Sequence, residues 1–241
     1  MIAYTRKNNV MPGLLAGLVL FLFFASVISV GAEAIGAKGY GKSYGDLSAA
    51  WWQWARSIPA DIVAPDGVSP GHPLAAQGDM DCSLNQSNGP IWFLGGSMFD
   101  GMAMIRNCVV PARKALFFPL VNGVTLNRES DNMTVDEKQE EAHFFGSLAC
   151  RMDSMLDNTP TVYSLPTVRA QSEPFLLEVA TPDVFGDDGV VDPEAVADGY
   201  WVMVPPLSKG EHVLHFTGSL CHPETGDPFF TSDVTYNLSV E

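Results

Sequence analysis

Positive charge is scarce in this sequence. Among 241 residues, Lys and Arg number 13 while Asp and Glu number 28, so the formal net charge is −15 at pH 7. A nucleic-acid-binding protein needs a basic face to meet phosphates, and anionic membrane surfaces attract basic segments. The composition therefore argues against both nucleic acid and anionic lipid surfaces as partners.

Several common sequence patterns are also missing. There is no C-x-x-C pair, which argues against a zinc ribbon or a thioredoxin-like site. The H-E-x-x-H zinc motif is absent as well. The sequence has no internal repeat, no coiled-coil pattern and no regular alternation of strands with helices. The last of these absences argues against a parallel α/β fold.

Residues 1–34 are typical of a secretory signal peptide. Arg6 and Lys7 precede an uncharged, mainly apolar run from Leu14 to Val30, and Ala32-Glu33-Ala34 fits the A-x-A cleavage pattern. The run is short for a membrane span, and an uncleaved signal anchor is the alternative. We expect a secreted or periplasmic protein that meets a membrane only through this segment, if the segment stays uncleaved.

Residues 35–241 form the predicted mature domain, a single β-sandwich domain that carries all four cysteines. These are Cys82, Cys108, Cys150 and Cys221. An even number of cysteines in an exported protein is typical of disulfides. Four cysteines allow three different pairings.

Two segments have the pattern of short helices. In the first, Leu47, Trp51, Trp54 and Ile58 recur at helical spacing, Ser43 or Asp46 can cap the start, and Pro59 marks the end. We expect this apolar stripe to dock on the sheets near the strands of Trp92 and Phe93. The second, acidic helix begins with a capping box at Thr134 and reaches about Gly146.

The rest of the sequence has the pattern of β-strands. Short apolar runs bounded by Gly, Pro and Asn predict strands at 91–95, 103–110, 115–121, 147–153, 161–165, 174–180, 200–204, 211–217 and 231–240. The last segment alternates clearly between apolar and polar residues. The pattern predicts a mainly β fold: an antiparallel β-sandwich or jelly-roll-like domain with two short helices. Residues 35–90 contribute the first helix and a proline-rich loop, both packed on the sandwich.

Two motif matches near the mature N-terminus fail their context tests. Residues 36–43 fit the P-loop expression, and residues 41–45 fit G-x-S-x-G. Both motifs work only when a buried strand precedes them, and here the signal segment does. We interpret Ser43 as a helix cap.

Three tryptophans are candidate ligand-binding residues: Trp52, Trp92 and Trp201. Trp52 projects away from the stripe of Trp51 and Trp54 on the first helix. Exposed aromatic rings on secreted β-proteins stack on sugars, while the alternative is that these rings belong to the core.

An acidic loop between Asp183 and Asp198 is the candidate metal site. The candidate calcium ligands are Asp183, Asp187, Asp188 and Asp192. Clustered carboxylates on a loop suit this hard cation, and a solvated acidic loop is the alternative. His212 and His215 lie three residues apart in one predicted strand, so they point to opposite faces and cannot bind one metal together. No other cofactor is expected.

Several segments together are distinctive: W-W-Q-W at 51–54, G-P-I-W-F-L at 89–94, C-V-V-P at 108–111, F-F-P at 117–119 with Asn122, D-G-Y-W at 198–201, P-L at 206–207 and G-E-H at 210–212. With these segments the sequence resembles a family of uncharacterised, predicted-secreted bacterial proteins. That resemblance implies one exported domain and a Cys82–Cys108 disulfide, and it carries over no catalytic residue. We further expect Cys150, in a mid-chain strand, to pair with Cys221, which lies between the last two strands.

These features predict an exported, non-catalytic binding or structural module at the bacterial surface or in the periplasm. Its expected partner is an extracellular polysaccharide or another surface protein. The alternative is a secreted carbohydrate-active enzyme, a polysaccharide hydrolase or lyase, because paired carboxylates can do acid–base chemistry. Glu173, Glu178 and Asp183 lie on or beside one predicted strand and are the carboxylates considered for that role.

Overall fold

The computed structural model describes residues 40–160 and 167–241. The predicted signal segment and the predicted strand at 161–165 lie outside the described residues. No helix in the described ranges is long and apolar enough to cross a membrane. The two helices are α2 (Tyr44–Arg56) and α3 (Val135–Ser147). The strands are β1 (Gly78–Asp79), β2 (Ile91–Phe93), β3 (Ala103–Val110), β4 (Ala115–Thr125), β5 (Ala149–Leu156), β6 (Thr159–Pro160), β7 (Val168–Gln171), β8 (Phe175–Glu178), β9 (Val191–Val204), β10 (Gly210–Cys221) and β11 (Pro228–Val240).

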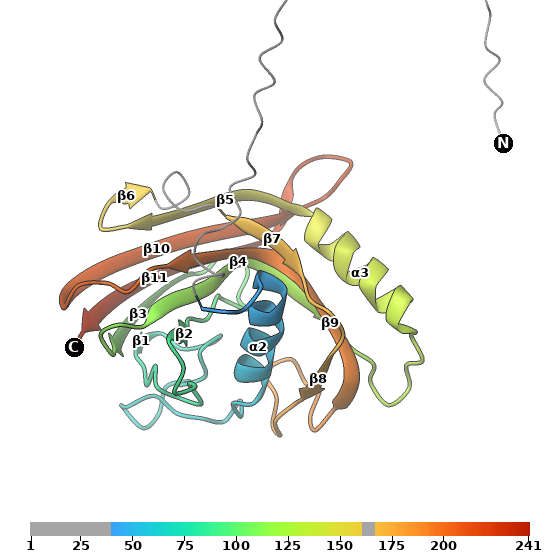
Figure 1. Cartoon of the computed structure of the whole chain (residues 1–241), viewed down its shortest axis with the longest axis horizontal. Helices are drawn as coiled ribbons and strands as arrows, with labels where there is room; N and C mark the ends of the chain where they lie inside the picture. The colour runs from blue at the N-terminus through green and yellow to red at the C-terminus, as the bar shows by residue number, and fades with distance from the viewer. Residues whose placement is uncertain (1–39, 161–166) are drawn as a thin grey trace, which may run out of the picture. The chain divides into compact units, whose positions relative to one another are not determined.

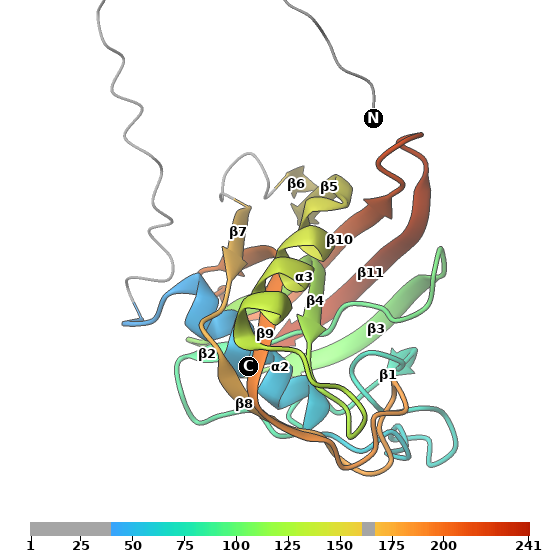
Figure 2. The same cartoon turned by 90° about the vertical axis from the view of Figure 1, so that its right-hand side faces the viewer.

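The strands form two sheets, which confirms the mainly β, sandwich-like prediction with two helices. One sheet has the order β1-β3-β11-β10-β5-β6, and the other has the order β2-β4-β9-β7 with β8 also pairing with β9 (Figures 1 and 2). Most pairings among the described strands are antiparallel. The pairs β1–β3, β3–β11 and β2–β4 are parallel, so both sheets are mixed.

The core between the sheets follows the alternation of the strands. On β11, Val234, Tyr236 and Leu238 are fully buried, as the sequence pattern predicts. They pack in one cluster with Phe216 of β10 and Phe118 of β4. The neighbouring positions of β4 point to the other face of its sheet, because successive strand residues alternate.

That second face is covered by α2 (Figure 1). Ser43 caps the helix in a capping box with Asp46, as expected. Trp51 and Trp54 are buried against the sheet, and their indole N–H groups donate to the carbonyl oxygens of Leu94 and Leu84, 2.9 and 2.8 Å away. The helix therefore docks where the sequence predicts.

The helix α3 lies on the face of this sheet opposite to α2 (Figure 1). Thr134 and Glu137 form the predicted capping box. A glycine on β4 allows the close approach, since a Cβ at Gly123 would lie 2.5 Å from the Phe145 ring. The two helices thus flank one strand pair, β4 and β9.

Both predicted disulfides are present. Cys82–Cys108 joins the proline-rich loop to β3, and Cys150–Cys221 joins β5 to the end of β10. Two disulfides are typical of proteins from an oxidising compartment, which agrees with the expected localisation.

Candidate functional site

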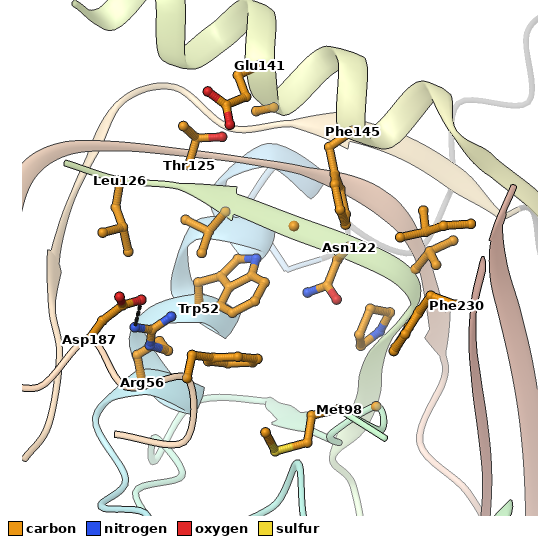
Figure 3. A pocket seen from close by; sticks show the side chains of 18 of the residues that line it. Trp52, Arg56, Met98, Asn122, Thr125, Leu126, Glu141, Phe145, Asp187 and Phe230 are labelled. Atoms are coloured by element: carbon orange, nitrogen blue, oxygen red, sulfur yellow. Dashed lines mark hydrogen bonds and ion pairs between the residues drawn. The ribbon is translucent and has the colours of Figure 1, made fainter. Parts of the chain in front are cut away.

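A cleft of about 1230 Å³ opens along β4 where its pairing with β2 ends. The pair β2–β4 stops at Phe117, whereas β4 continues to Thr125 on its other partner, β9. The second edge of β4 therefore faces open space. The walls come from α2, α3, the loop at Phe185–Asp187, the segment 96–98 and the end of the β10–β11 hairpin (Figure 3).

Two polar groups in the cleft wall have no hydrogen-bond partner in the part of the chain that the structure describes. They are the indole Nε1 of Trp52 and the amide Nδ2 of Asn122, and both atoms are shielded from water. Trp52 is only 5% exposed. Figure 3 shows the Asn122 amide directed toward the Trp52 ring. A buried donor without an acceptor is costly. Because an acceptor oxygen of a guest is as large as a water molecule, it can reach these two donors only if their side chains turn toward the cleft.

Aromatic side chains make up much of the remaining surface. Phe185 faces the cleft from the loop beside α2, Phe144 and Phe145 from α3, and Phe229 and Phe230 from β11. Phe144, Phe185 and Phe229 are exposed to solvent. Exposed rings that line one concavity are typical of a binding site rather than of a core.

An ion network lies at the end of the cleft formed by the C-terminus of α2 and the loop at Phe185–Asp187. Arg56, buried at the end of α2, pairs with Asp183 and Asp187, with 2.9 Å between charged atoms in each case. Arg128 pairs with Asp187 from the far side. Burial alone would raise the pKa of Asp187, but hydrogen bonds from Arg56 and Arg128 hold that pKa below its ordinary value. These charges are matched within the protein and fix the loop at Phe185–Asp187.

The structure separates the three candidate tryptophans. Trp52 lines the cleft, but as a buried part of its wall and not as an open stacking surface. Trp92 is buried in the core between the sheets. Trp201 is buried beneath α2 and stacks on Phe117, with 5.0 Å between ring centroids. Neither Trp92 nor Trp201 lines the cleft, so Trp52 is the candidate of this set that the structure places at the site.

The acidic loop is held by side chains of the protein. Asp183 and Asp187 face Arg56, the Asp188 carboxylate accepts from the Asp183 N–H at 2.7 Å, and Asp192 binds Lys138. Within the described ranges, no group of three or more His, Cys, Asp or Glu side chains is arranged to hold a metal ion. The calcium hypothesis stays a prediction.

Other residues singled out in the sequence lie away from the cleft. His212 pairs with Asp157 and His215 with Asp233, 2.7 and 2.9 Å apart. The carboxylates Glu173 and Glu178 do not line the cleft, and Ser43 caps α2.

The sequence interpretation missed Asn122, Phe145 and Phe185. A usable signal existed for Asn122, because it is a polar residue inside the apolar strand at 115–125. Phe144 and Phe145 also stand out as an aromatic pair in an otherwise polar helix. Phe185 was missed because it lies in a loop whose acidic residues were interpreted as metal ligands.

No protein-family model matches the chain, and no curated protein matches it. The resemblance to predicted-secreted bacterial proteins stays a prediction.

Proposed function

We propose that this protein is an exported, non-catalytic binding module that takes its ligand in the cleft along β4. The observation that carries the proposal is the pair of unpartnered donors, Trp52 Nε1–H and Asn122 Nδ2, in the wall of an aromatic-lined cleft. When the Trp52 and Asn122 side chains turn toward the cleft, a bound acceptor oxygen would satisfy groups that are otherwise buried at a cost. The two ligand classes that fit are an extracellular polysaccharide and a segment of another surface protein.

The second candidate function is a polysaccharide hydrolase or lyase. A cleft of about 1230 Å³ favours it, because enzymes enclose their substrates in clefts. The carboxylates of Glu137 and Glu141 both line the cleft on α3. However, the Glu137 carboxylate accepts hydrogen bonds from the backbone N–H and the hydroxyl of Thr134, so it is engaged in capping α3. These bonds lower its pKa, whereas the acid of a glycosidase needs a raised pKa to hold its proton. We therefore rank binding first.

Two matched single variants test the proposal. Trp52→Phe removes the unpartnered indole N–H at the cleft, and Trp92→Phe removes an equally buried one in the core between the sheets. Both variants are to be screened with the parent protein on arrays of polysaccharides and peptides and in a polysaccharide-degradation assay. We expect binding without degradation, weakened by Trp52→Phe and unaffected by Trp92→Phe. Equal effects of the two variants would contradict the cleft as the binding site, and depolymerised product would favour the enzyme.

A further inference from the structure

We propose that the open edge of β4, at Asn122 and Val124, receives an extended polypeptide segment as an added strand. The segment carries alternating apolar and basic residues. This inference rests on the proposed function, since it uses the same cleft and names the class of ligand.

The register of the sheet fixes which backbone groups face the cleft. The N–H of Ser172 donates to the carbonyl oxygen of Ala197 at 2.8 Å, so the backbone groups of Ala197 point toward β7 and away from β4. Ala197 is the antiparallel partner of Val124. In such a pair both residues turn their N–H and C=O groups away from each other. The backbone groups of Val124 therefore point away from β9 and into the cleft.

Asn122 has the same orientation as Val124, because strand residues two apart point the same way. Its partner on β9 is Gly199. A Cβ at Gly199 would clash with the Asn122 Cβ, 2.6 Å away, and side chains approach most closely in the pairs that exchange no hydrogen bonds. Two successive sets of backbone donors and acceptors thus line the cleft.

No described strand covers this edge. The only described strand on that side of β4 is β2, and its pairing ends at Phe117. An uncovered edge is a template for strand addition, and proteins generally block such edges. Here the edge is recessed between α2 and α3, so only a chain that enters the cleft can reach it.

The two sides of the edge differ in chemistry, as Figure 3 shows. Trp52 and Arg56 lie on the α2 side of β4, where Val124 also packs. Phe145 and Glu141 lie on the α3 side. Side chains of an added strand alternate between these two sides. One set would meet the rings of Trp52 and Phe185, and the other would meet an aromatic ring and a carboxylate.

Charge favours a basic residue in the second set. Glu137, Glu141 and Asp131 line the cleft, and its two cations, Arg56 and Arg128, are paired with Asp187. A polysaccharide also offers oxygen acceptors, but it lacks N–H and C=O groups at the repeat of a strand. The observations therefore favour a peptide over a sugar.

The probe is a seven-residue peptide of alternating Val and Lys with blocked ends. Two matched versions carry N-methyl groups either on the inner Val residues or on the inner Lys residues. In an added strand, one alternate set of N–H groups binds β4 and the other faces away. We expect binding to the purified protein to be abolished by one methylation pattern and kept with the other. The amides of Asn122 and Val124 should exchange at least tenfold more slowly when the unmethylated peptide is bound. Equal binding of the two methylated peptides, or unchanged exchange at both amides, overturns the proposal.

Two neighbouring glutamates on α3 supply the second test. Glu141→Gln removes a carboxylate from the cleft wall, while Glu140→Gln changes an exposed neighbour outside it. We expect the dissociation constant for the Val-Lys peptide to rise about two- to fivefold in Glu141→Gln, the size expected of an exposed ion pair, and to stay unchanged in Glu140→Gln. Polysaccharide binding that Trp52→Phe weakens, with no peptide binding, overturns this inference and leaves the proposed function intact. Absence of any ligand sensitive to Trp52→Phe overturns both.

Discussion

The ammonium group of Lys138 donates to both carboxylate oxygens of Asp192, at 2.8 and 2.7 Å, and both side chains are almost fully buried. This pair joins α3 to the start of β9 and so sets the distance between the α3 wall of the cleft and the sheet. Asp192 also accepts from the backbone N–H groups of Asn127 and Glu194.

Removing one partner of this pair should be strongly destabilising. Lys138→Met leaves the Asp192 carboxylate buried without its cation, and we expect a loss of about 3–5 kcal/mol in the free energy of unfolding. Combining Lys138→Met with Asp192→Leu also removes the unpaired carboxylate and should recover part of the lost stability. Urea unfolding of the two single variants and the double variant measures this coupling. Strictly additive losses would contradict the pair as a stabilising unit.

The acid stability of the protein should depend on His72. Burial lowers the pKa of this ring to about 4, although its Nε2 lies 3.2 Å from the Ala55 carbonyl oxygen. In the unfolded chain the value is 6.5. Between pH 6.5 and 4 the unfolded chain therefore binds a proton that the folded protein does not, so protonation favours unfolding in this window.

The contribution of His72 is fully present above pH 6.5 and is lost as the pH falls toward 4. At about 1.4 kcal/mol per pH unit, we expect a loss of about 3 kcal/mol between pH 7 and 4.5. Urea unfolding at both values, in the parent protein and in His72→Gln, measures it. The variant should lose clearly less stability on acidification. A loss as large as that of the parent would mean that other groups account for the acid sensitivity.

The disulfide that closes the longer loop should contribute more to stability, because the entropy cost of loop closure grows with the logarithm of loop length. The bridges Cys82–Cys108 and Cys150–Cys221 span 26 and 71 residues. The chain-entropy account gives about 3.6 and about 4.4 kcal/mol for loops of these lengths. Unfolding of the two double Cys→Ala variants checks the order. A smaller loss in Cys150→Ala/Cys221→Ala than in Cys82→Ala/Cys108→Ala would contradict the loop-length argument.

Much of the fold is predictable because the deciding signals are local. The capping residues Ser43 and Thr134 fix both helix starts, and alternation along 231–240 places its apolar residues in the core. The first half of β9 was missed, since it contains Asp192, Pro193, Glu194 and Asp198. Those residues fit a buried strand only because Lys138 and Arg169 neutralise the aspartates. The parallel pairings were missed because local pattern does not encode strand direction.

Only one of the predicted ligand-binding residues, Trp52, lies at the candidate site. Trp52 was a candidate because of its position on the first helix, but the cleft depends on where β2 stops pairing with β4, which no short segment encodes. The loop carboxylates were interpreted as calcium ligands, yet their partners, Arg56 and Lys138, lie far away in sequence. Long-range ion pairing is the information that the sequence pattern lacks.

The orientation of the β4 edge can be tested with proline. Val124→Pro removes an N–H that points into the cleft, whereas Thr125→Pro removes one that points toward β9, given the register of these strands. Proline is tolerated where the strand N–H faces away from its neighbour. We expect Thr125→Pro to be more destabilising by about 1–3 kcal/mol, the cost of a broken buried hydrogen bond. Thermal unfolding of both variants decides, and the reverse order would mean that Val124 is bonded to β9.

Truncation of the neighbouring tryptophans tests how α2 packs. Trp51 and Trp52 are both buried, and their rings meet edge to face with 5.1 Å between centroids. Trp51→Ala and Trp52→Ala should therefore each cost about 3–5 kcal/mol, as for other buried large aromatics. Chemical unfolding measures both values. An unchanged stability in Trp52→Ala would contradict the burial of this ring and favour an open stacking platform.

Phenylalanine substitutions separate packing from hydrogen bonding at the same two positions. Trp51 Nε1–H donates to the Leu94 carbonyl oxygen at 2.9 Å, and Trp52 Nε1–H has no acceptor among the described residues. Trp51→Phe deprives a buried carbonyl of its donor and should cost about 1–3 kcal/mol more than Trp52→Phe. Trp52→Phe instead removes an unsatisfied group, so it should weaken ligand binding while it largely preserves the free energy of unfolding. If unfolding shows equal losses, the Trp52 indole is bonded within the protein, and the argument that its N–H awaits a ligand fails.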